Sequence, residues 1–217
     1  MSIVQNPLIG RARQKLGGTV FTTWKGINVI KGKPLTVANP RTDAQTMRRS
    51  AMTQMVAIGR SLSAAINFGF KEQAVRKSQF NAFVGYGLRN AFDYAAPPVA
   101  TLEESDLLFS QGTVAKTDTT SIVADQSANT LTVNWPTTAD LPGQSANDIL
   151  VVVMQATNTE NWLSFFPGTV RSAGTSVINV PAGEILVGDP VNVYTFFYNA
   201  TSRKSSDNTY ESVNPIA

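Results

Sequence analysis

The side chains that could do chemistry in this chain are carboxylates, because the sequence has no histidine and no cysteine. Without histidine there is no Ser-His-Asp triad, and the commonest general base and metal ligand is missing. Without cysteine there are no disulfides, thiolate nucleophiles or zinc–thiolate sites. These absences exclude most hydrolase and metalloenzyme chemistry, and leave a carboxylate pair or an oxygen-ligand metal site as the remaining options.

Neither remaining option has a supporting pattern. The densest acidic cluster, in Glu103–Asp106, lies on one short stretch, and its carboxylates are expected to form a solvated turn rather than to face each other across a sugar. Asp140, Asp148 and Asp189 lack the spacing of a calcium loop. The segment Gly85-Tyr86-Gly87 lacks the rest of a nucleotide-binding fingerprint. We therefore predict no enzymatic activity, no cofactor and no metal.

Charge divides the chain into two halves. Residues 1–95 carry fourteen lysines and arginines and three acids, a net charge of +11, whereas residues 96–217 carry four bases and twelve acids, a net charge of −8. The basic half can face nucleic acid or an acidic protein surface, and the acidic half is itself such a surface. Contacts between copies are therefore as natural as nucleic-acid contacts, and two solvated charged faces are the plainer alternative.

Ten residues of the basic half are the candidates for assembly or nucleic-acid contacts. They are Arg11, Arg13, Lys15, Trp24, Lys25, Lys31, Lys33, Arg41, Arg48 and Arg49. An aromatic ring among lysines can stack on single-stranded bases. The alternative for Trp24 is packing on the helix that follows it.

These candidates lie on an arm, a hairpin and a helix. Residues 1–17 indicate an extended basic arm, and residues 18–33 a β-hairpin with a tight turn at Lys25-Gly26. Pro40 ends whatever precedes it, and Thr42 with Gln45 matches a capping box for a helix that runs to Ile66. Its apolar stripe is Met47, Ala51, Met55, Ile58, Leu62 and Ile66.

A second helix and a change of pattern follow. The helix is predicted from Ser78 to Phe92, where Gly85 and Gly87 mark a close approach to the first helix. We predict an α+β chain with a helical anchoring domain at 1–95, a proline-containing linker at 96–106 and an immunoglobulin- or fibronectin-like β-sandwich at 107–217. Strands are expected at Leu107–Ala115, Ser121–Ala124, Thr130–Trp135, Asp148–Ala156, Trp162–Arg171, Ser176–Val180, Pro190–Ala200 and Thr209–Val213.

Several short motifs together carry a family resemblance. They are Trp24-Lys25-Gly26, Lys33-Pro34, Asn39-Pro40-Arg41-Thr42 with Gln45 and Arg48-Arg49, Leu131-Thr132-Val133-Asn134-Trp135 and the stretch from Gly188 to Phe197. On these residues the chain resembles a group of small, functionally unassigned proteins of Bacteroidota genomes and their prophages. The Asn-Pro-Arg-Thr segment also resembles one in minor virion proteins of tailed phages. The resemblance implies a structural setting in a phage or prophage and no reaction.

We therefore predict a non-enzymatic virion component of a tailed phage or prophage. It would be an accessory capsid, connector or tail protein that assembles through its basic N-terminal region, with copies of itself, other virion proteins and packaged nucleic acid as the expected partners. The first alternative is a nucleic-acid-binding protein that uses the basic hairpin. The second is a surface- or glycan-binding module that uses sandwich loops around Trp162 and Tyr210, although structural packing is the favoured role for these two aromatic residues.

The expected location follows from the apolar runs. The N-terminal residues contain no apolar run as long as a signal-peptide core, and no apolar run in the sequence is as long as a membrane-spanning helix. The product is therefore expected to be soluble, made in the host cytoplasm and located in the virion without membrane contact.

Overall fold

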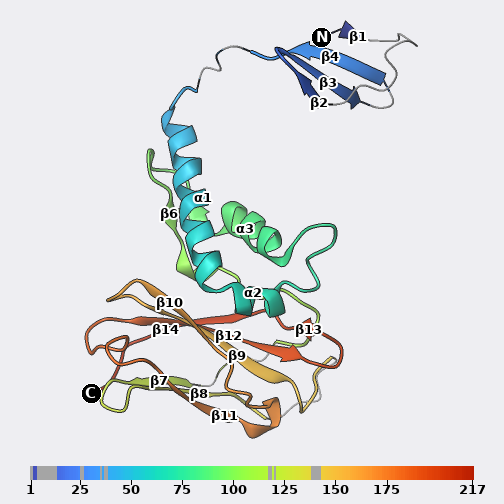
Figure 1. Ribbon diagram of the computed structural model, residues 1–217. Coiled ribbons are helices and arrows are strands. Elements are labelled where there is room, and N and C mark those ends of the chain that lie inside the picture. The colour runs from blue at the N-terminus through green and yellow to red at the C-terminus, as the bar shows by residue number, and fades with distance from the viewer. Residues whose placement is uncertain are drawn as a thin grey trace. The chain divides into compact units, whose positions relative to one another are not determined.

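Two compact units make up the chain, Met1–Thr42 (unit 1) and Asp43–Ala217 (unit 2). The computed structural model describes residues 2–3, 14–24, 27–34, 36, 39–116, 119, 121–137 and 143–217 (Figure 1). The described part contains a β-hairpin, helices and several antiparallel sheets, so the predicted α+β class is confirmed.

Unit 1 is an antiparallel sheet in the strand order β1-β4-β3-β2. The predicted hairpin is present as β3 (Thr19–Trp24) and β4 (Ile27–Gly32). The predicted extended arm is part of the sheet where it is described, because β1 (Ser2–Ile3) pairs with β4 and β2 (Gln14–Leu16) pairs with β3. Gly17, with φ of 58°, begins the two-residue turn that joins β2 to β3.

The first predicted helix is interrupted by a bend. It begins where the capping pattern places it, as α1 (Asp43–Ser61), but Leu62 interrupts it, and α2 (Ser63–Gly69) follows. Leu62 has φ of −107° and ψ of 22°, outside the regular helical range. Every residue of the predicted apolar stripe is buried, so the periodicity was right although the helix is not continuous.

The second predicted helix is α3 (Gln79–Asn90), where Ser78 caps the N-terminus by accepting a hydrogen bond from the backbone N–H of Asn81 at 3.1 Å. A Cβ atom at Gly87 would lie 2.3 Å from Cε of Met55, which confirms the predicted close approach to α1. Gly85 has no such neighbour within 4 Å. Only one of the two glycines therefore serves the helix contact.

Two packed antiparallel sheets confirm the predicted β-sandwich. The larger has the order β10-β9-β12 with β14 and the short β13 both paired to β12, and the smaller has the order β11-β8-β7. Their bounds are β7 (Ser121–Asp125), β8 (Thr130–Asn134), β9 (Ile149–Ala156), β10 (Asn161–Phe165), β11 (Thr175–Asn179), β12 (Val191–Asn199), β13 (Lys204–Ser205) and β14 (Thr209–Val213). The third, sixth and last long strands share one sheet, as in immunoglobulin-like sandwiches.

Two predicted strands differ from the structure. The segment Leu107–Ala115 forms no strand beyond an isolated bridge at Val114. Its backbone N–H groups bond to scattered acceptors: that of Phe109 donates to Oδ1 of Asn208 at 2.9 Å, and that of Gln111 donates to the carbonyl oxygen of Gly69 at 3.1 Å. The predicted strand Trp162–Arg171 ends early, at Phe165, because Pro167 and Gly168 interrupt it, and Arg171 begins a 3₁₀ turn, η2 (Arg171–Ala173).

The segment at 96–106 does not separate two domains. It contains β6 (Thr101–Leu102), which pairs with β5 (Phe92–Asp93), and the 3₁₀ turn η1 (Glu104–Asp106). Ala100 is buried, and its carbonyl oxygen accepts a hydrogen bond from Nε2 of Gln54 at 3.4 Å. The segment therefore packs along α1.

One sheet of the sandwich is buried on both faces, which joins the helices to it. Along β12, Val193 packs into the core between the two sheets, whereas Tyr194 packs into a second core with α1, α2 and α3. Figure 1 shows α2 on the side of the β9–β12 sheet opposite to β7, β8 and β11. The helices therefore belong to the compact unit of the sandwich, and the unit boundary lies after Thr42 rather than near residue 95.

Candidate functional site

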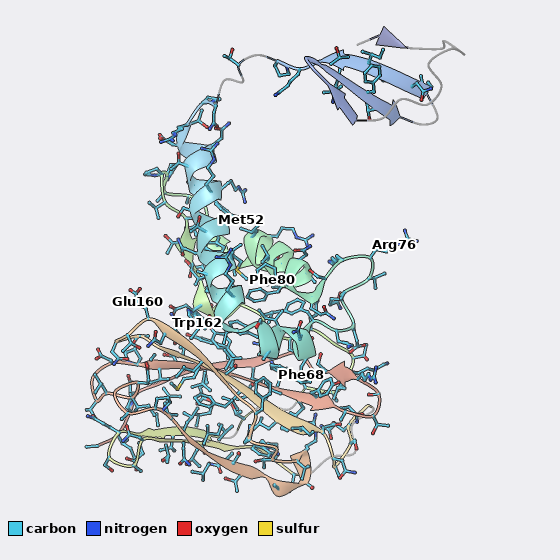
Figure 2. The ribbon with its side chains drawn as sticks, viewed as in Figure 1. Met52, Phe68, Arg76, Phe80, Glu160 and Trp162 are labelled. Atoms are coloured by element: carbon cyan, nitrogen blue, oxygen red, sulfur yellow. The ribbon has the colours of Figure 1, made fainter. Side chains whose placement is uncertain are left out.

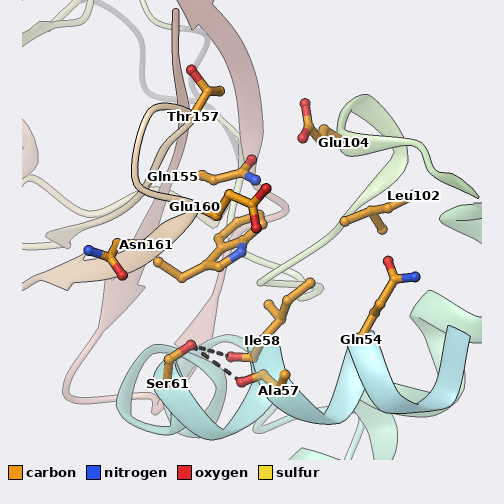
Figure 3. A pocket seen from close by; sticks show the side chains of 11 residues that line it. Gln54, Ala57, Ile58, Ser61, Leu102, Glu104, Gln155, Thr157, Glu160 and Asn161 are labelled. Carbon is orange, nitrogen blue, oxygen red and sulfur yellow. Dashed lines mark hydrogen bonds between the residues drawn. The ribbon is translucent and has the colours of Figure 1, made fainter. Parts of the chain in front are cut away.

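A cleft of about 600 Å³ lies in unit 2, between α1, the 96–106 segment and the β9–β10 hairpin. Its lining is Gln54, Ala57, Ile58 and Ser61 of α1, Leu102 of β6, Glu104 of η1, and Gln155, Thr157, Glu160, Asn161 and Trp162 of the hairpin. Figure 3 shows Gln54 and Ser61 on the helix facing Gln155 and Glu160 across the opening. The volume is in the range of small-molecule sites, and the lining contains carboxylates and amides but no lysine or arginine.

A hydrogen-bond network beneath the cleft orients Gln155. Nδ2 of Asn192 donates to Oε2 of Glu104 at 2.7 Å and to Oε1 of Gln155 at 3.0 Å. The hydroxyl of Tyr210 donates to Oδ1 of Asn192 at 3.0 Å, so the asparagine is held at both ends. Burial raises the pKa of Tyr210, and the nearby carboxylate of Glu104 adds to the effect, which keeps this hydroxyl protonated as the donor.

The orientation of the Gln155 amide follows from the carboxylate. An ionised carboxylate only accepts, so the Asn192 atom that faces Glu104 is nitrogen, and the Gln155 atom that the same nitrogen contacts is oxygen. Nε2 of Gln155 is therefore the end left over, and no described residue accepts from it. Gln155 as a whole is 9% exposed. Every fully buried polar side-chain atom of the described residues has a hydrogen-bond partner. Because Nε2 of Gln155 has none, it is not fully buried and is accessible from the cleft that Gln155 lines.

Trp162 presents a second unpaired donor. Its indole N–H has no acceptor among the described residues. Since every fully buried polar side-chain atom of these residues has a partner, the indole nitrogen is accessible to solvent. The ring is half-buried and packs on Phe109 and Tyr194 with centroid distances of 5.4 and 6.0 Å. Figure 2 shows Trp162 between α1 and the sandwich, with Glu160 reaching outward beside it. The tryptophan was predicted as a candidate in the glycan-binding alternative.

The ten predicted contact residues fall in both units. Arg11, Arg13 and Lys25 lie outside the described residues, and Lys15 and Trp24 lie in β2 and β3 with side chains that the structure does not describe. Lys31, Lys33 and Arg41 are exposed in unit 1, whereas Arg48 and Arg49 are exposed on α1 in unit 2. The guanidinium of Arg48 lies 3.6 Å from the ring centroid of Tyr94, so that arginine is engaged within its own unit.

The acidic residues form no metal centre in the described part of the chain. Asp148 pairs with Arg171 inside the sandwich, Asp189 is exposed in a turn and Asp140 lies outside the described residues. In the predicted solvated turn, Glu103 and Asp106 are exposed, but Glu104 is half-buried and holds Asn192. No helix of the described part is long and apolar enough to cross a membrane.

A family model matches residues 10–211, which include most of unit 1 and nearly all of unit 2. The chain belongs to DUF6266, a family of unknown function. The DUF6266 match includes every residue that lines the cleft. No curated protein and no solved structure matches the chain significantly.

Proposed function

We propose that the protein is a non-enzymatic structural component of a tailed-phage or prophage virion, and that unit 1 holds it in the particle. The observation that carries the proposal is the charge of unit 1. Met1–Thr42 contains seven lysines and arginines and no acid. None of these cations can form an ion pair inside the unit, and an acidic surface of a partner would neutralise them.

The sheet of unit 1 arranges part of this charge regularly. Lys15 of β2 and Lys31 of β4 are both in register with Val20 of β3, so the two lysines belong to one row across the sheet. Lys33 follows directly after β4 and is exposed, as is Arg41. Lysines at one register position of neighbouring strands suit an acidic protein surface or a phosphate backbone.

The size of unit 1 supports a role in assembly. Of its described side chains only Val29 is buried, at 4% exposure. Units near 40 residues usually depend on disulfides, metals or association for stability, and this chain has no cysteine. Contact with a partner would supply the missing burial.

The acidic surface that fits best is unit 2 of a neighbouring copy. Asp43–Ala217 carries fifteen acids and eleven bases, a net charge of −4 against +7 for unit 1. A contact between the basic unit of one copy and the acidic unit of the next is head-to-tail, and repeated contacts of this kind build a ring or a filament of many copies. Such repetition is what a virion component needs.

Light scattering of the full-length protein at about 50 mM and about 500 mM salt tests the self-association, because salt screens contacts between exposed charges. The test variant is Lys31→Gln/Lys33→Gln/Arg41→Gln in unit 1. The control, Lys77→Gln/Arg203→Gln/Lys204→Gln, removes the same charge from exposed positions of unit 2. We expect assemblies at low salt for the wild type and the control, and monomers for the test variant. A wild type that is monomeric at both salt concentrations would contradict the proposed contact.

The same proteins separate assembly from nucleic-acid binding. Anisotropy of a labelled single-stranded oligonucleotide reports binding, and phosphate contacts weaken steeply with salt. A monomeric wild type that binds the oligonucleotide in this salt-dependent way would replace our proposal with the nucleic-acid alternative.

The virion location has its own test. Particles purified from an induced strain that carries the gene should contain the chain, detected by mass spectrometry at many copies per particle. Particles that lack it would overturn the assignment to the virion whatever the self-association shows.

A further inference from the structure

We propose that the cleft between α1, η1 and the β9–β10 hairpin binds an uncharged saccharide. The cleft lies wholly within unit 2, so the inference is independent of the assembly proposed for unit 1. It starts from the two unpaired N–H donors in the lining, on Gln155 and Trp162.

The Gln155 donor is built into the site. Rotation of the Gln155 amide would break the hydrogen bond that it accepts from Asn192. Asn192 cannot rotate to compensate without losing its own bonds to the Glu104 carboxylate and the Tyr210 hydroxyl. The Gln155 side chain is nearly buried, but its unpaired Nε2 is accessible from the cleft, so this donor is fixed in place and open to a ligand. A ligand acceptor seated in the cleft would supply the partner.

Acceptors line the same cleft. Glu104 gives one carboxylate oxygen to Asn192, and no described residue donates to the carboxylate of Glu160. Carboxylates without a lysine or arginine beside them repel an acidic ligand. The ligand must therefore donate hydrogen bonds to carboxylates, accept them from Gln155 and Trp162, and carry no negative charge.

A sugar meets these requirements better than a basic side chain. Each hydroxyl is both donor and acceptor, whereas an ammonium or guanidinium group only donates and would leave Gln155 and Trp162 unpaired. Several hydroxyls on one small ring can reach both kinds of group in a cleft of about 600 Å³. The charge and the donors together select a neutral polyhydroxyl ligand.

Trp162 adds a flat apolar surface to the site. Phe109 and Tyr194 pack on the indole ring, so its position is fixed before any ligand arrives. An amphipathic aromatic ring gives large contact area at low entropic cost. The C–H face of a pyranose would lie on this ring while its hydroxyl groups point to the amide and the carboxylates.

The turn that carries Glu160 is held in a strained conformation. Glu160 has φ of 56°, a left-handed conformation that few residues other than glycine and asparagine adopt readily. The residues on either side are tied down, because Thr159 and Asn161 donate to the carboxylate of Glu184 at 2.5 and 2.8 Å. These hydrogen bonds hold the two residues that flank Glu160, and the Glu160 side chain lies at the rim of the cleft.

The test is binding of the full-length protein to an array of uncharged and sialylated glycans, followed by calorimetric titration with the best neutral oligosaccharide. Gln155→Glu keeps an oxygen for Asn192, replaces the N–H donor by a second acceptor and adds one negative charge beside Glu104, and the charge change is matched in the control. The matched control, Gln126→Glu, keeps an oxygen to accept from the backbone N–H of Val187, and neither residue lines the cleft. Glu160→Gln changes an exposed side chain and leaves folding intact.

We expect neutral glycans to bind and sialylated ones to fail. Gln155→Glu and Trp162→Phe should each weaken binding at least tenfold, Glu160→Gln should weaken it several-fold, and Gln126→Glu should match the wild type. No binding of any neutral glycan would overturn the proposal. So would equal affinity of the wild type and Gln155→Glu, or capture of a lysine-rich peptide in preference to every glycan.

Discussion

Arg171 and Asp148 form an ion pair inside the sandwich, with 3.2 Å between Nε and Oδ2 and side chains that are 6% and 0% exposed. The same aspartate accepts hydrogen bonds from Nδ2 of Asn199 at 2.7 Å and from the backbone N–H of Ser145 at 2.9 Å. The guanidinium lies 4.0 Å over the ring of Phe197. Burial lowers the pKa of Arg171, and the charge of Asp148 opposes that shift. The pair joins the start of β9 to the β10–β11 connection.

Removing the aspartate should leave a buried cation without its carboxylate. We expect Asp148→Ala to lower the free energy of unfolding by about 3–5 kcal/mol, measured by urea denaturation. The control Asp189→Ala removes an exposed carboxylate and should stay within about 0.5 kcal/mol of the wild type. A loss below about 1 kcal/mol for Asp148→Ala would show that the pair does not stabilise the sandwich in this way.

Tyr194 should make stability depend on alkaline pH. Its hydroxyl donates to the carbonyl oxygen of Glu104 at 2.8 Å, and burial, with Tyr210 and Glu104 nearby, raises its pKa well above the ordinary value of 10.0. Because the folded state favours the protonated form, this contribution is complete below pH 10 and is lost as the pH rises above the pKa of the unfolded chain.

The matching variant is Tyr194→Phe. It should be less stable than the wild type by about 1 kcal/mol at pH 7, because it lacks the hydrogen bond. Above pH 10 this gap should narrow by up to about 1.4 kcal/mol per pH unit, measured by urea unfolding between pH 7 and 11. Thr195→Val removes a buried hydroxyl that does not titrate in this range. The pH dependence of its free energy of unfolding should therefore parallel that of the wild type. A constant gap for Tyr194→Phe would contradict the prediction.

Two glycines of α3 should respond oppositely to the same substitution. A Cβ at Gly87 would meet Sδ of Met55 at 2.5 Å, so we expect Gly87→Ala to destabilise the protein by about 1–3 kcal/mol through overpacking. Gly85 has open space, so Gly85→Ala should stabilise it by about 0.5–1 kcal/mol through helix propensity. Thermal and urea unfolding measure both. Equal effects of the two substitutions would mean that the α1–α3 contact adapts to the extra methyl group.

Local patterns in the sequence were sufficient for most of the elements. The predicted strand Pro190–Ala200 is present as β12, and its successive residues Val193 and Tyr194 lie in separate cores because side chains alternate between the two faces of a strand. The three- and four-residue spacing of the α1 stripe predicted its buried side correctly. The bend at Leu62 was missed because the apolar spacing continues through it.

The domain division could not be predicted from the same patterns. An apolar stripe on α1 shows that one face is buried but not which surface covers it. The structure covers it with α3 and with the outer face of the β9–β12 sheet, more than 80 residues away in the chain. The backbones of Gly69 and Phe109 also approach closely in this core. A Cβ atom at Gly69 would lie 2.0 Å from the carbonyl oxygen of Phe109, so only glycine fits there.

The cleft itself was not predicted, and Trp162 of its lining was named only as a loop residue in the glycan-binding alternative. Gln54, Glu104 and Gln155 come from three segments, and nothing in their local sequence relates them. Asn192 and Glu104, whose hydrogen bond orients the site, are separated by 88 residues. The free end of the Gln155 amide therefore exists only in the folded chain.

By itself the sequence determined the types of element, the split of charge between the two ends and the absence of histidine and cysteine chemistry. These are local properties, because hydrophobic period and charge depend on residues close together in the chain. Only the tertiary structure decided which apolar faces meet, that α1 shares a core with the sandwich, and which polar atoms of the cleft are left for a ligand. Those outcomes depend on contacts between distant residues, whose burial and hydrogen bonds arise only when the chain is folded.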